Sequence, residues 1–479
     1  MVYETVIGLE CHVQLATQSK MFCGCSPDYA GSPPNSHVCP ICLGMPGVLP
    51  VINRQAVEYT LLTGLALRSE IPESTKFDRK NYPYPDLVKG YQISQYDMPL
   101  VKGGIVEITV GDAAPRQIRL ERVHLEEDTG KLTHTADGSL VDYNRCGVAL
   151  MEMVSQPDLR TPGEARAYLM KLRAILRTLG VSDADMDKGQ LRCDVNVSLR
   201  PVGQETLGTK VEVKNLNSFR AVLHSLEYEI QRQTEILDRG ERISQETRGW
   251  NEERGTTVSQ RSKEEAHDYR YFPEPDLPPL FIERSWLAAL QARLPELPDA
   301  RRTRYMTQFG LGAYDAEALS TDAVSAGLFE ATVAAGADAK KAANWIQNDV
   351  ARLRSEADSS VAGPENGHVL DARHLAELIR LVDDGVIGIS AARQVLPRVF
   401  STGAAPRAVV EELGLAQVSD SSALQAAAQA AIESNPAAVA DYRSGKTSAI
   451  NFLKGQVMKE TRGKANPAVA EAALRKLLD

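Results

Sequence analysis

The chain has 479 residues, of which 43% are hydrophobic and 24% are charged, and its formal net charge is -9. This composition excludes a disordered chain, and the acidic balance argues against a protein that coats nucleic acid over its whole surface. The length predicts two or three domains. No apolar stretch approaches the length of a membrane span, and no basic region precedes an apolar run at the N-terminus, so we expect a cytoplasmic protein without a signal peptide.

The composition changes near residue 294. Residues 1–293 carry β-branched runs and frequent turn residues, which predict a β-rich body. Beyond it alanine and leucine dominate with helical spacing, as in Asp371–Val382, and we expect two small all-α domains there. Proline-rich segments at 273–280 and 294–298 mark the join. The predicted fold class is therefore α+β.

Three predicted strands of the body, Ile7–Leu15, Leu191–Leu199 and Lys210–Lys214, share one pattern. Each has an apolar face and a polar face that carries an acid. The polar faces hold Glu10, His12 and Gln14 in the first strand, Arg192, Asp194, Asn196 and Ser198 in the second, and Lys210, Glu212 and Lys214 in the third. For one strand alone, a solvated face of a one-sided sheet explains this equally well. Asp, Asn, Glu and His are poor strand formers, however, and this favours a functional reason.

Two other segments add acids. Arg122–Lys131 places Glu126, Glu127 and Asp128 in succession beside His124, although such acid runs usually lie on a solvated surface. Glu152 stands inside an apolar run, where burying a carboxylate is costly unless it is paired or binds a metal.

The candidate set has hard oxygen donors and one imidazole. Its members are Glu10, His12, Glu126, Glu127, Glu152, Asp194 and Glu212. Such a set suits Mg²⁺ better than a transition metal, and Mg²⁺ held by carboxylates commonly serves phosphate chemistry. The sequence has neither a Walker A motif nor the protein-kinase signatures, so a nucleotide site here is of an uncommon type.

Four of the seven cysteines lie close together, as Cys23-x-Cys25 and Cys39-x-x-Cys42. Two paired thiolate donors are typical of a closed, structural zinc site, so we predict zinc in the loop 23–42. Four uncoordinated thiols are the alternative, and His37 is a substitute ligand. We expect the other cysteines, Cys11, Cys146 and Cys193, to be buried small residues rather than nucleophiles.

The C-terminal tail is basic within an acidic protein. Residues 441–479 contain eight Lys or Arg and four Asp or Glu. The positions nearest to Gly455 and Gly463 are Lys454, Lys459, Arg462 and Lys464. Basic side chains beside small residues suit contact with a phosphate backbone, although a solvated helix end explains the composition equally well.

The chain resembles the family of B subunits of the glutamyl/aspartyl-tRNA amidotransferase. The matching segments, in family order, are VIGLECHVQL at 6–15, KFDRKNYPYPDLVKGYQISQYD at 76–97, RVHLEEDTGK at 122–131, MEMVSQPD at 151–158, LRCDVNVS at 191–198, VEVKNLNSF at 211–219, RSKEEAHDYRYFPEPDLPPL at 261–280, NWI at 344–346 and LKGQVMKETRGKANP at 453–467. Cys11, Pro83, Val88 and Ala149 depart from the residues expected in that pattern. The resemblance spans nearly the whole chain.

The resemblance implies a fold and a reaction. It implies a catalytic cradle domain at 1–293, a helical domain at 294–405 and a small YqeY-like, tRNA-binding tail at 406–479. In the reaction, ATP phosphorylates the carboxylate of misacylated Glu-tRNA(Gln) or Asp-tRNA(Asn), and ammonia then displaces phosphate. The ammonia comes from a glutaminase A subunit, and a small C subunit completes the heterotrimer.

Together with the residue patterns, the resemblance assigns roles. Glu10, His12, Glu126, Glu152, Asp194 and Glu212 are expected to be catalytic, with Glu10, Glu152 and Asp194 binding Mg²⁺. Glu127, Asn196, Lys210 and Lys214 are assigned to cofactor binding, and Lys454, Lys459, Arg462 and Lys464 to tRNA. The sequence does not distinguish between the two misacylated tRNAs.

Three rival interpretations remain. A non-enzymatic zinc-ribbon protein that binds RNA explains the cysteines and the basic tail, but it leaves the acid-bearing strands without a role. A metal-dependent phosphodiesterase or nuclease would use the same acids without ATP. An archaeal relative specific for Glu-tRNA is expected to carry a large inserted domain, for which 479 residues leave no room.

Overall fold

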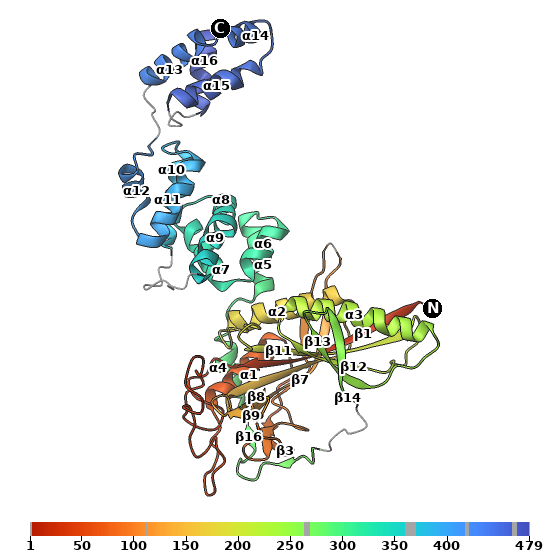
Figure 1. The fold of residues 1–479 in the computed structure, drawn as a ribbon. Coiled ribbons are helices and arrows are strands. Elements are labelled where there is room, and N and C mark those ends of the chain that lie inside the picture. The colour runs from red at the N-terminus through yellow and green to blue at the C-terminus, as the bar shows by residue number, and fades with distance from the viewer. Residues whose placement is uncertain are drawn as a thin grey trace. The chain divides into compact units, whose positions relative to one another are not determined.

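The fold is described by a computed structural model, which covers residues 2–111, 113–262, 269–359, 370–416, 421–461 and 467–478. The chain divides into two compact units, residues 1–298 and 299–479. Among the described residues, no helix is both long and apolar enough to cross a membrane. The β-rich first unit and the helical second unit confirm the predicted α+β class (Figure 1).

A mixed sheet of nine strands forms the centre of the first unit. Along the sheet the strands run β14 (Thr256–Ser262), β13 (Glu246–Asn251), β12 (Val211–Leu216), β11 (Leu191–Pro201), β1 (Tyr3–Gln14), β10 (Ala149–Ser155), β7 (Arg116–Glu127) and β5 (Val101–Lys102), and β6 (Ile105–Ile108) also pairs with β7. The β12–β13 pair is parallel, and the other neighbours are antiparallel. The three strands whose polar faces carry acids in the sequence, β1, β11 and β12, are therefore adjacent.

Three helices pack on the apolar face of this sheet. They are α1 (Arg54–Ala66), α2 (Pro162–Leu179) and α3 (Phe219–Asp238). Leu61, Leu172 and Leu226 from these helices share one core with Leu9 and Val13 of β1. The local sequence sets the helix ends. In α2, for example, the Thr161 side chain caps the first turn and Gly180 ends the helix with a left-handed backbone, φ 67°.

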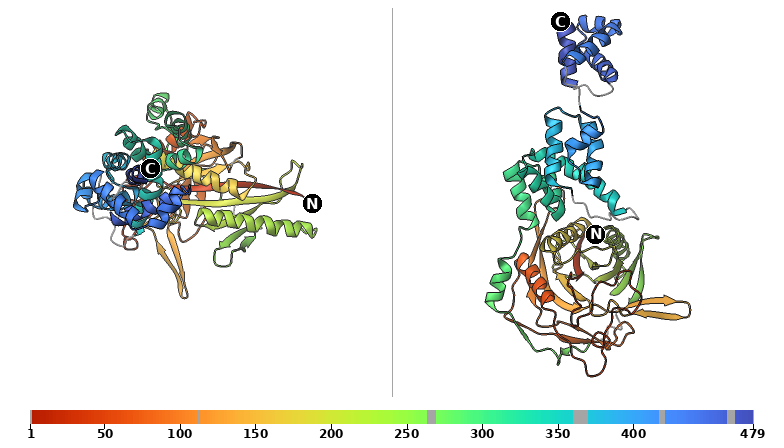
Figure 2. Two further views of the ribbon diagram at one scale, coloured as in Figure 1. Left: turned by 90° about the horizontal axis from the view of Figure 1, so that it is seen from above. Right: turned by 90° about the vertical axis from the view of Figure 1, so that its left-hand side faces the viewer.

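Several smaller elements lie next to the central sheet. A three-stranded sheet runs β15 (Phe272–Pro273), β3 (Asp78–Asn81), β4 (Tyr91–Ser94), and β2 (Ser74–Thr75) pairs with β16 (Leu280–Phe281). Helix α4 (Arg284–Gln291) packs against α1. The hairpin of β8 (Lys131–Thr135) and β9 (Gly138–Asp142) extends away from the central sheet (Figure 2).

The second unit contains two separate hydrophobic cores. The first core is built by α5 (Pro298–Phe309), α6 (Ala313–Ser320), α7 (Ala323–Ala334), α8 (Ala339–Trp345), a π-helical turn (Ile346–Val350), α9 (Ala351–Ser359), α10 (Ala372–Asp383), α11 (Ile389–Thr402) and α12 (Pro406–Glu412). The second is built by α13 (Ser421–Glu433), α14 (Pro436–Arg443), α15 (Ala449–Glu460) and α16 (Pro467–Leu478).

Two sequence expectations bear on this helical unit. Helix α10 occupies the segment expected to be helical, and the Asp371 side chain caps it by accepting from the Arg373 amide. The expected division at 405/406 would group α12 with the last helices. In the structure, Val409 and Val410 of α12 lie in the core of the preceding helices.

Candidate active site

The strand register brings the predicted acids onto one face in the middle of the sheet. In β1, His12 lies opposite Glu152 of β10, and Glu10 lies opposite Asp194 of β11. Glu152 in turn lies opposite His124 of β7. Because side chains alternate along a strand while opposed residues share a face, these side chains point to the same side of the sheet.

His12 lies at the centre of this group. Its Nε2 is 3.3 Å from a carboxylate oxygen of Glu152, and 3.8 Å from a carboxylate oxygen of both Glu10 and Glu126. The donor atoms form two overlapping sets, Glu10–His12–Asp194 and His12–Glu126–Glu152, and within each set they lie within 4.8 Å of one another. Several carboxylates and one imidazole at this spacing fit one or two hard cations such as Mg²⁺.

The charges of the site act strongly on one another. Burial alone would lower the pKa of His12, but its hydrogen bond to Glu152 and the charge of Glu126 raise it to about 9. Burial would raise the pKa of Glu152, yet His124 and His12 hold it well below its usual range. Burial and the charge of Glu152 raise the pKa of Glu10. Glu152 therefore stays ionised, while Glu10 takes a proton more readily than an isolated glutamate.

The neighbouring strand β12 supplies a cation at the edge of this group. The Lys214 ammonium lies 2.7 Å from Asp194 and 3.5 Å from Glu212. Glu212 also accepts a hydrogen bond of 2.7 Å from the Thr247 hydroxyl. The side-chain oxygen of Asn196, opposite Glu212, is buried and has no hydrogen-bond partner among the described residues. This edge thus combines a charged amine with a side-chain oxygen whose hydrogen-bonding capacity is unused.

Two predicted cofactor residues lie elsewhere. Glu127 stands one residue beyond Glu126 on β7 and so faces the opposite side, where its carboxylate accepts from Lys89 Nζ at 2.6 Å and from the Ile93 amide at 3.0 Å. Lys210 is exposed and lies just before β12. The strand was expected to begin at Lys210, but it begins at Val211. Neither residue joins the group around His12.

Two residues of the site were not assigned from the sequence. His124 is buried, and its Nε2 lies 3.4 Å from Glu152. The alternation of Arg122, His124 and Glu126 along β7 was the signal that would have found it. Lys80 belongs to β3 in another sheet, and the charges of Glu126 and Glu152 raise its pKa although burial alone would lower it. Its proximity depends on tertiary packing, for which the sequence has no periodic signal.

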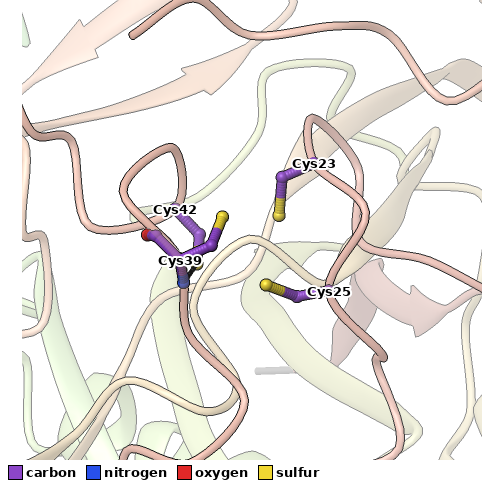
Figure 3. A group of neighbouring side chains, drawn as sticks. All are labelled: Cys23, Cys25, Cys39 and Cys42. Carbon is purple, nitrogen blue, oxygen red and sulfur yellow. Dashed lines mark hydrogen bonds between the residues drawn. The ribbon is translucent and has the colours of Figure 1, made fainter.

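The four clustered cysteines converge between two loops (Figure 3). The donor sulfurs of Cys23, Cys25, Cys39 and Cys42 lie within 4.8 Å of one another. The Cys39 amide donates to Cys42 Sγ at 3.1 Å. The hydrogen bond from Cys23 and the charge of the nearby Lys20 help to lower the pKa of Cys42 to about 5. A four-sulfur set with one readily formed thiolate fits a structural Zn²⁺.

His37 and the other three cysteines do not belong to this cluster. His37 lies outside the four-sulfur set, and its Nε2 is 3.1 Å from the Ser32 hydroxyl. Cys11, Cys146 and Cys193 are buried, as expected, and Cys11 and Cys193 face each other with their sulfurs 3.9 Å apart. None of these three thiols is exposed to solvent.

The basic residues of the tail differ in their surroundings. Lys454 forms an ion pair of 2.9 Å with Glu471, and Lys459 is exposed on α15. Arg462 and Lys464 lie outside the described residues. Because Glu471 neutralises the charge of Lys454, Lys459 is the better of the two described candidates for a phosphate contact.

The polar face of this sheet gathers carboxylates around one histidine, and the donor set is of the kind that suits a hard cation in an enzyme site. Comparison with known proteins identifies the family. The GatB/GatE catalytic domain matches residues 5–288, and the GatB domain matches residues 327–478, so the chain belongs to the GatB family.

Several curated relatives match over their full length, and all are B subunits of the aspartyl/glutamyl-tRNA(Asn/Gln) amidotransferase. That of Thermomicrobium roseum is 54% identical over 483 residues, covering 100% of this chain and 99% of the relative. That of Moorella thermoacetica is 53% identical over 487 residues, covering 100% of both chains. That of Dehalococcoides mccartyi strain CBDB1 is 52% identical over 490 residues, covering 100% of this chain and 99% of the relative. The resemblance seen in the sequence is thereby confirmed.

Proposed function

We propose that the chain is the component of a tRNA-dependent amidotransferase that activates and amidates Glu or Asp carried on tRNA. The observation that carries this proposal is the convergence of Glu10, Glu126, Glu152 and Asp194 around His12. Transfer of a phosphoryl group from ATP to a carboxylate concentrates negative charge, and a cation-binding acidic site suits that step.

The proposed reaction has two steps. A carboxylate oxygen of the aminoacyl side chain attacks the γ-phosphorus of ATP, the bond to ADP breaks, and an acyl phosphate forms. Ammonia then attacks the acyl carbon, the carbon–oxygen bond to phosphate breaks, and the nitrogen loses a proton to give the amide. Phosphorylation is needed because a free carboxylate is a poor electrophile.

The residues of the site take distinct roles in this proposal. Glu10, Glu152 and Asp194 hold Mg²⁺, which when bound neutralises charge on the transferring phosphates. His12, whose Nε2 lies 3.3 Å from a carboxylate oxygen of Glu152, orients that acid. Lys214 contacts Asp194 and Glu212 at the edge and is placed to meet a phosphate oxygen.

We assign the supply of ammonia to a glutaminase A subunit, with a small C subunit completing a heterotrimer. The relatives are themselves named as one lettered component of an amidotransferase, which supports a complex of several different chains. The cysteines of this chain support the division of labour, because four form the sulfur cluster and the other three are buried. We retain the cytoplasm as the proposed location.

The decisive experiment is transamidation by the purified complex on Glu-tRNA(Gln) and on Asp-tRNA(Asn), assayed separately. We expect ATP-dependent formation of Gln-tRNA(Gln), Asn-tRNA(Asn) or both, with release of ADP and phosphate. RNA binding without ATP turnover would instead support the zinc-ribbon interpretation. Degradation of tRNA without ATP would support a nuclease.

The sulfur cluster leads to a separate prediction about stability. Replacing Cys39 by serine removes one of four thiolates, so bound zinc should fall well below one ion per chain and the loop 23–42 should become more accessible to protease. The midpoint of thermal unfolding should fall, while kcat of the remaining folded protein changes little. Cys193→Ser is the matched control, since Cys193 is buried in the core and faces Cys11 rather than the cluster. Unchanged stability of wild type in a strict chelator would contradict the zinc assignment.

The helices α13–α16 lead to a prediction about tRNA binding. Because they share a core of their own, deleting residues 417–479 should raise the KM for tRNA and leave glutamine hydrolysis by the partner largely intact. Lys459→Gln should lower the log–log salt slope of tRNA binding by about one, the value of one phosphate contact. The control is Lys446→Gln, because Lys446 already pairs with Asp441 at 3.0 Å. An unchanged affinity and slope would assign the basic charge to a solvated surface.

A further inference from the structure

Four tyrosines, Tyr82, Tyr96, Tyr269 and Tyr271, form a row of ring contacts, here called the tyrosine row. Tyr96 and Tyr271 stack with centroids 4.3 Å apart and an interplanar angle of 13°. Tyr271 meets Tyr269 edge-on at 6.2 Å, and Tyr269 meets Tyr82 at 5.5 Å. Tyr96 is 61% exposed, and the other three are half-buried. One end of the row is therefore open to a ligand.

Ordinary core packing does not explain these rings. The hydrophobic core of the first unit includes partly buried neighbours such as Tyr59 and Tyr91, but none of the four tyrosines of the row, all of which lie in the described part of the chain. Aromatic rings held together at a surface forgo the stabilisation of burial in a core. A binding role accounts for their arrangement.

Hydrogen bonds from backbone amides hold the segments of Tyr269 and Tyr96 against strand β3. The Asn81 amide donates to the Tyr269 carbonyl at 2.8 Å, and the Tyr96 amide donates to the Asp78 carboxylate at 3.0 Å. Strand β15 pairs with β3 directly after Tyr271. The row is thus pre-organised, which lowers the entropy cost of binding a planar group.

Two contacts connect the row to the acidic site. The Lys80 ammonium lies 4.9 Å from the centroid of Tyr269, and the charges of Glu126 and Glu152 act on this ammonium. Two residues before Tyr96, the Ser94 hydroxyl donates to the Glu126 carboxylate at 3.2 Å. Burial is the largest cause that raises the pKa of Tyr82 and of Tyr271 to about 12, so these phenols stay neutral beside an anionic ligand.

We propose that the tyrosine row stacks the 3′-terminal nucleobase of the aminoacylated tRNA and so positions the aminoacyl carboxylate at the acids around His12. This inference rests on the proposed function. The aminoacyl group is esterified to the terminal ribose, so only that ribose and the amino acid itself separate the base from the reacting carboxylate. Stacking of a base on tyrosine is a common mode of single-strand recognition, and the Lys80 ammonium can meet the adjoining phosphate.

The test uses Tyr96→Ala and Tyr271→Ala in the full-length chain within its complex, with Tyr96→Phe and Tyr271→Phe as matched controls. Tyr96→Ala should raise the KM for misacylated tRNA roughly 5- to 150-fold, which corresponds to the loss of one base–aromatic stack. Tyr271→Ala removes the ring that stacks behind Tyr96 and should raise this KM by a smaller factor. The phenylalanine variants keep the ring and should stay near wild type. The KM for ATP and the midpoint of thermal unfolding should change little in all four variants.

A second measurement identifies the base. Wild-type complex should bind intact tRNA more tightly than tRNA trimmed of its terminal nucleoside, whereas the Tyr96→Ala variant should bind both equally. A raised KM for ATP in place of tRNA would overturn the proposal by assigning the row to the adenine of ATP. Equal discrimination in wild type and alanine variants would also overturn it. A wild-type complex without transamidation would contradict the proposed function itself, and the comparison of intact with trimmed tRNA would still test the row.

Discussion

Replacing Glu152 by glutamine should lower kcat for transamidation by roughly 10²- to 10³-fold, the usual loss when one pre-organised electrostatic contact at a reacting centre is removed. Glu152 is the acid that both His12 and His124 approach most closely, at 3.3 and 3.4 Å. Glutamine keeps the size of the side chain but removes its charge. Without that charge the proposed cation site loses a ligand, and the pKa of His12 should fall.

Single-turnover formation of the acyl phosphate and steady-state amide formation would both measure this effect. Glu205→Gln is the control, since Glu205 is an exposed acid of the first unit that lies outside the group around His12. It should keep kcat within about twofold and a normal unfolding midpoint. A Glu152→Gln variant with wild-type kcat would remove Glu152 from the chemistry.

Replacing Glu229 by glutamine should destabilise the first unit by about 3–5 kcal/mol, the usual cost of breaking a buried ion pair by removing one partner. Glu229 on α3 is fully buried and lies 2.8 Å from Arg232 and 3.2 Å from Arg248. Its carboxylate also accepts from Gln233 at 3.1 Å and from the Thr257 hydroxyl at 2.5 Å. The substitution leaves Arg232 and Arg248 to share one remaining carboxylate, that of Glu246, which lies 3.9 and 2.7 Å from them.

The same group makes stability depend on pH. Burial would raise the pKa of Glu229, but the hydrogen bond from Arg232 and its other partners lower it overall. A lowered folded-state pKa contributes stability above the unfolded value, near about 4.3, and this contribution is lost as the pH falls through the folded value. Thermal unfolding across the acidic range up to neutral pH would measure it.

A matched acid on the same helix supplies the control. Glu235 is exposed and accepts a hydrogen bond from Gln231 within the helix, so Glu235→Gln should change stability by less than about 0.5 kcal/mol. Glu229→Gln should also show less acid destabilisation than wild type, because the titrating carboxylate is gone. Equal unfolding midpoints for the two variants at neutral pH would show that the arginines find other partners.

The sequence predicted the strands of the site well because their alternation is a local property. The patterns around Glu10, Asp194 and Glu212 identified three strands that do pair side by side, with ends shifted by a few residues. Glu152 was found from the cost of an acid in an apolar run, and it is indeed buried opposite His12. The four-cysteine spacing likewise predicted the sulfur cluster.

The predictions were weaker where a run of similar residues was treated as one group. Glu126 and Glu127 are adjacent, so a strand directs them to opposite sides, and only Glu126 reaches His12. Among the basic residues of the tail, Lys454 pairs with Glu471 from another helix, which spacing along the chain does not reveal.

The sequence by itself determined the family, the α+β class, the strands that carry Glu10, Asp194 and Glu212, and the cysteine cluster, because composition, period-two alternation and motif spacing are encoded locally. Only the tertiary structure decided that His12 joins two sets of acids, that His124 and Lys80 adjoin them, and that tyrosines from three segments meet in one row. These contacts depend on strand order and on the approach of segments far apart in the chain. The physical reason is that burial and hydrogen bonding over the whole domain select which strands and segments meet. No short segment of the sequence contains that information.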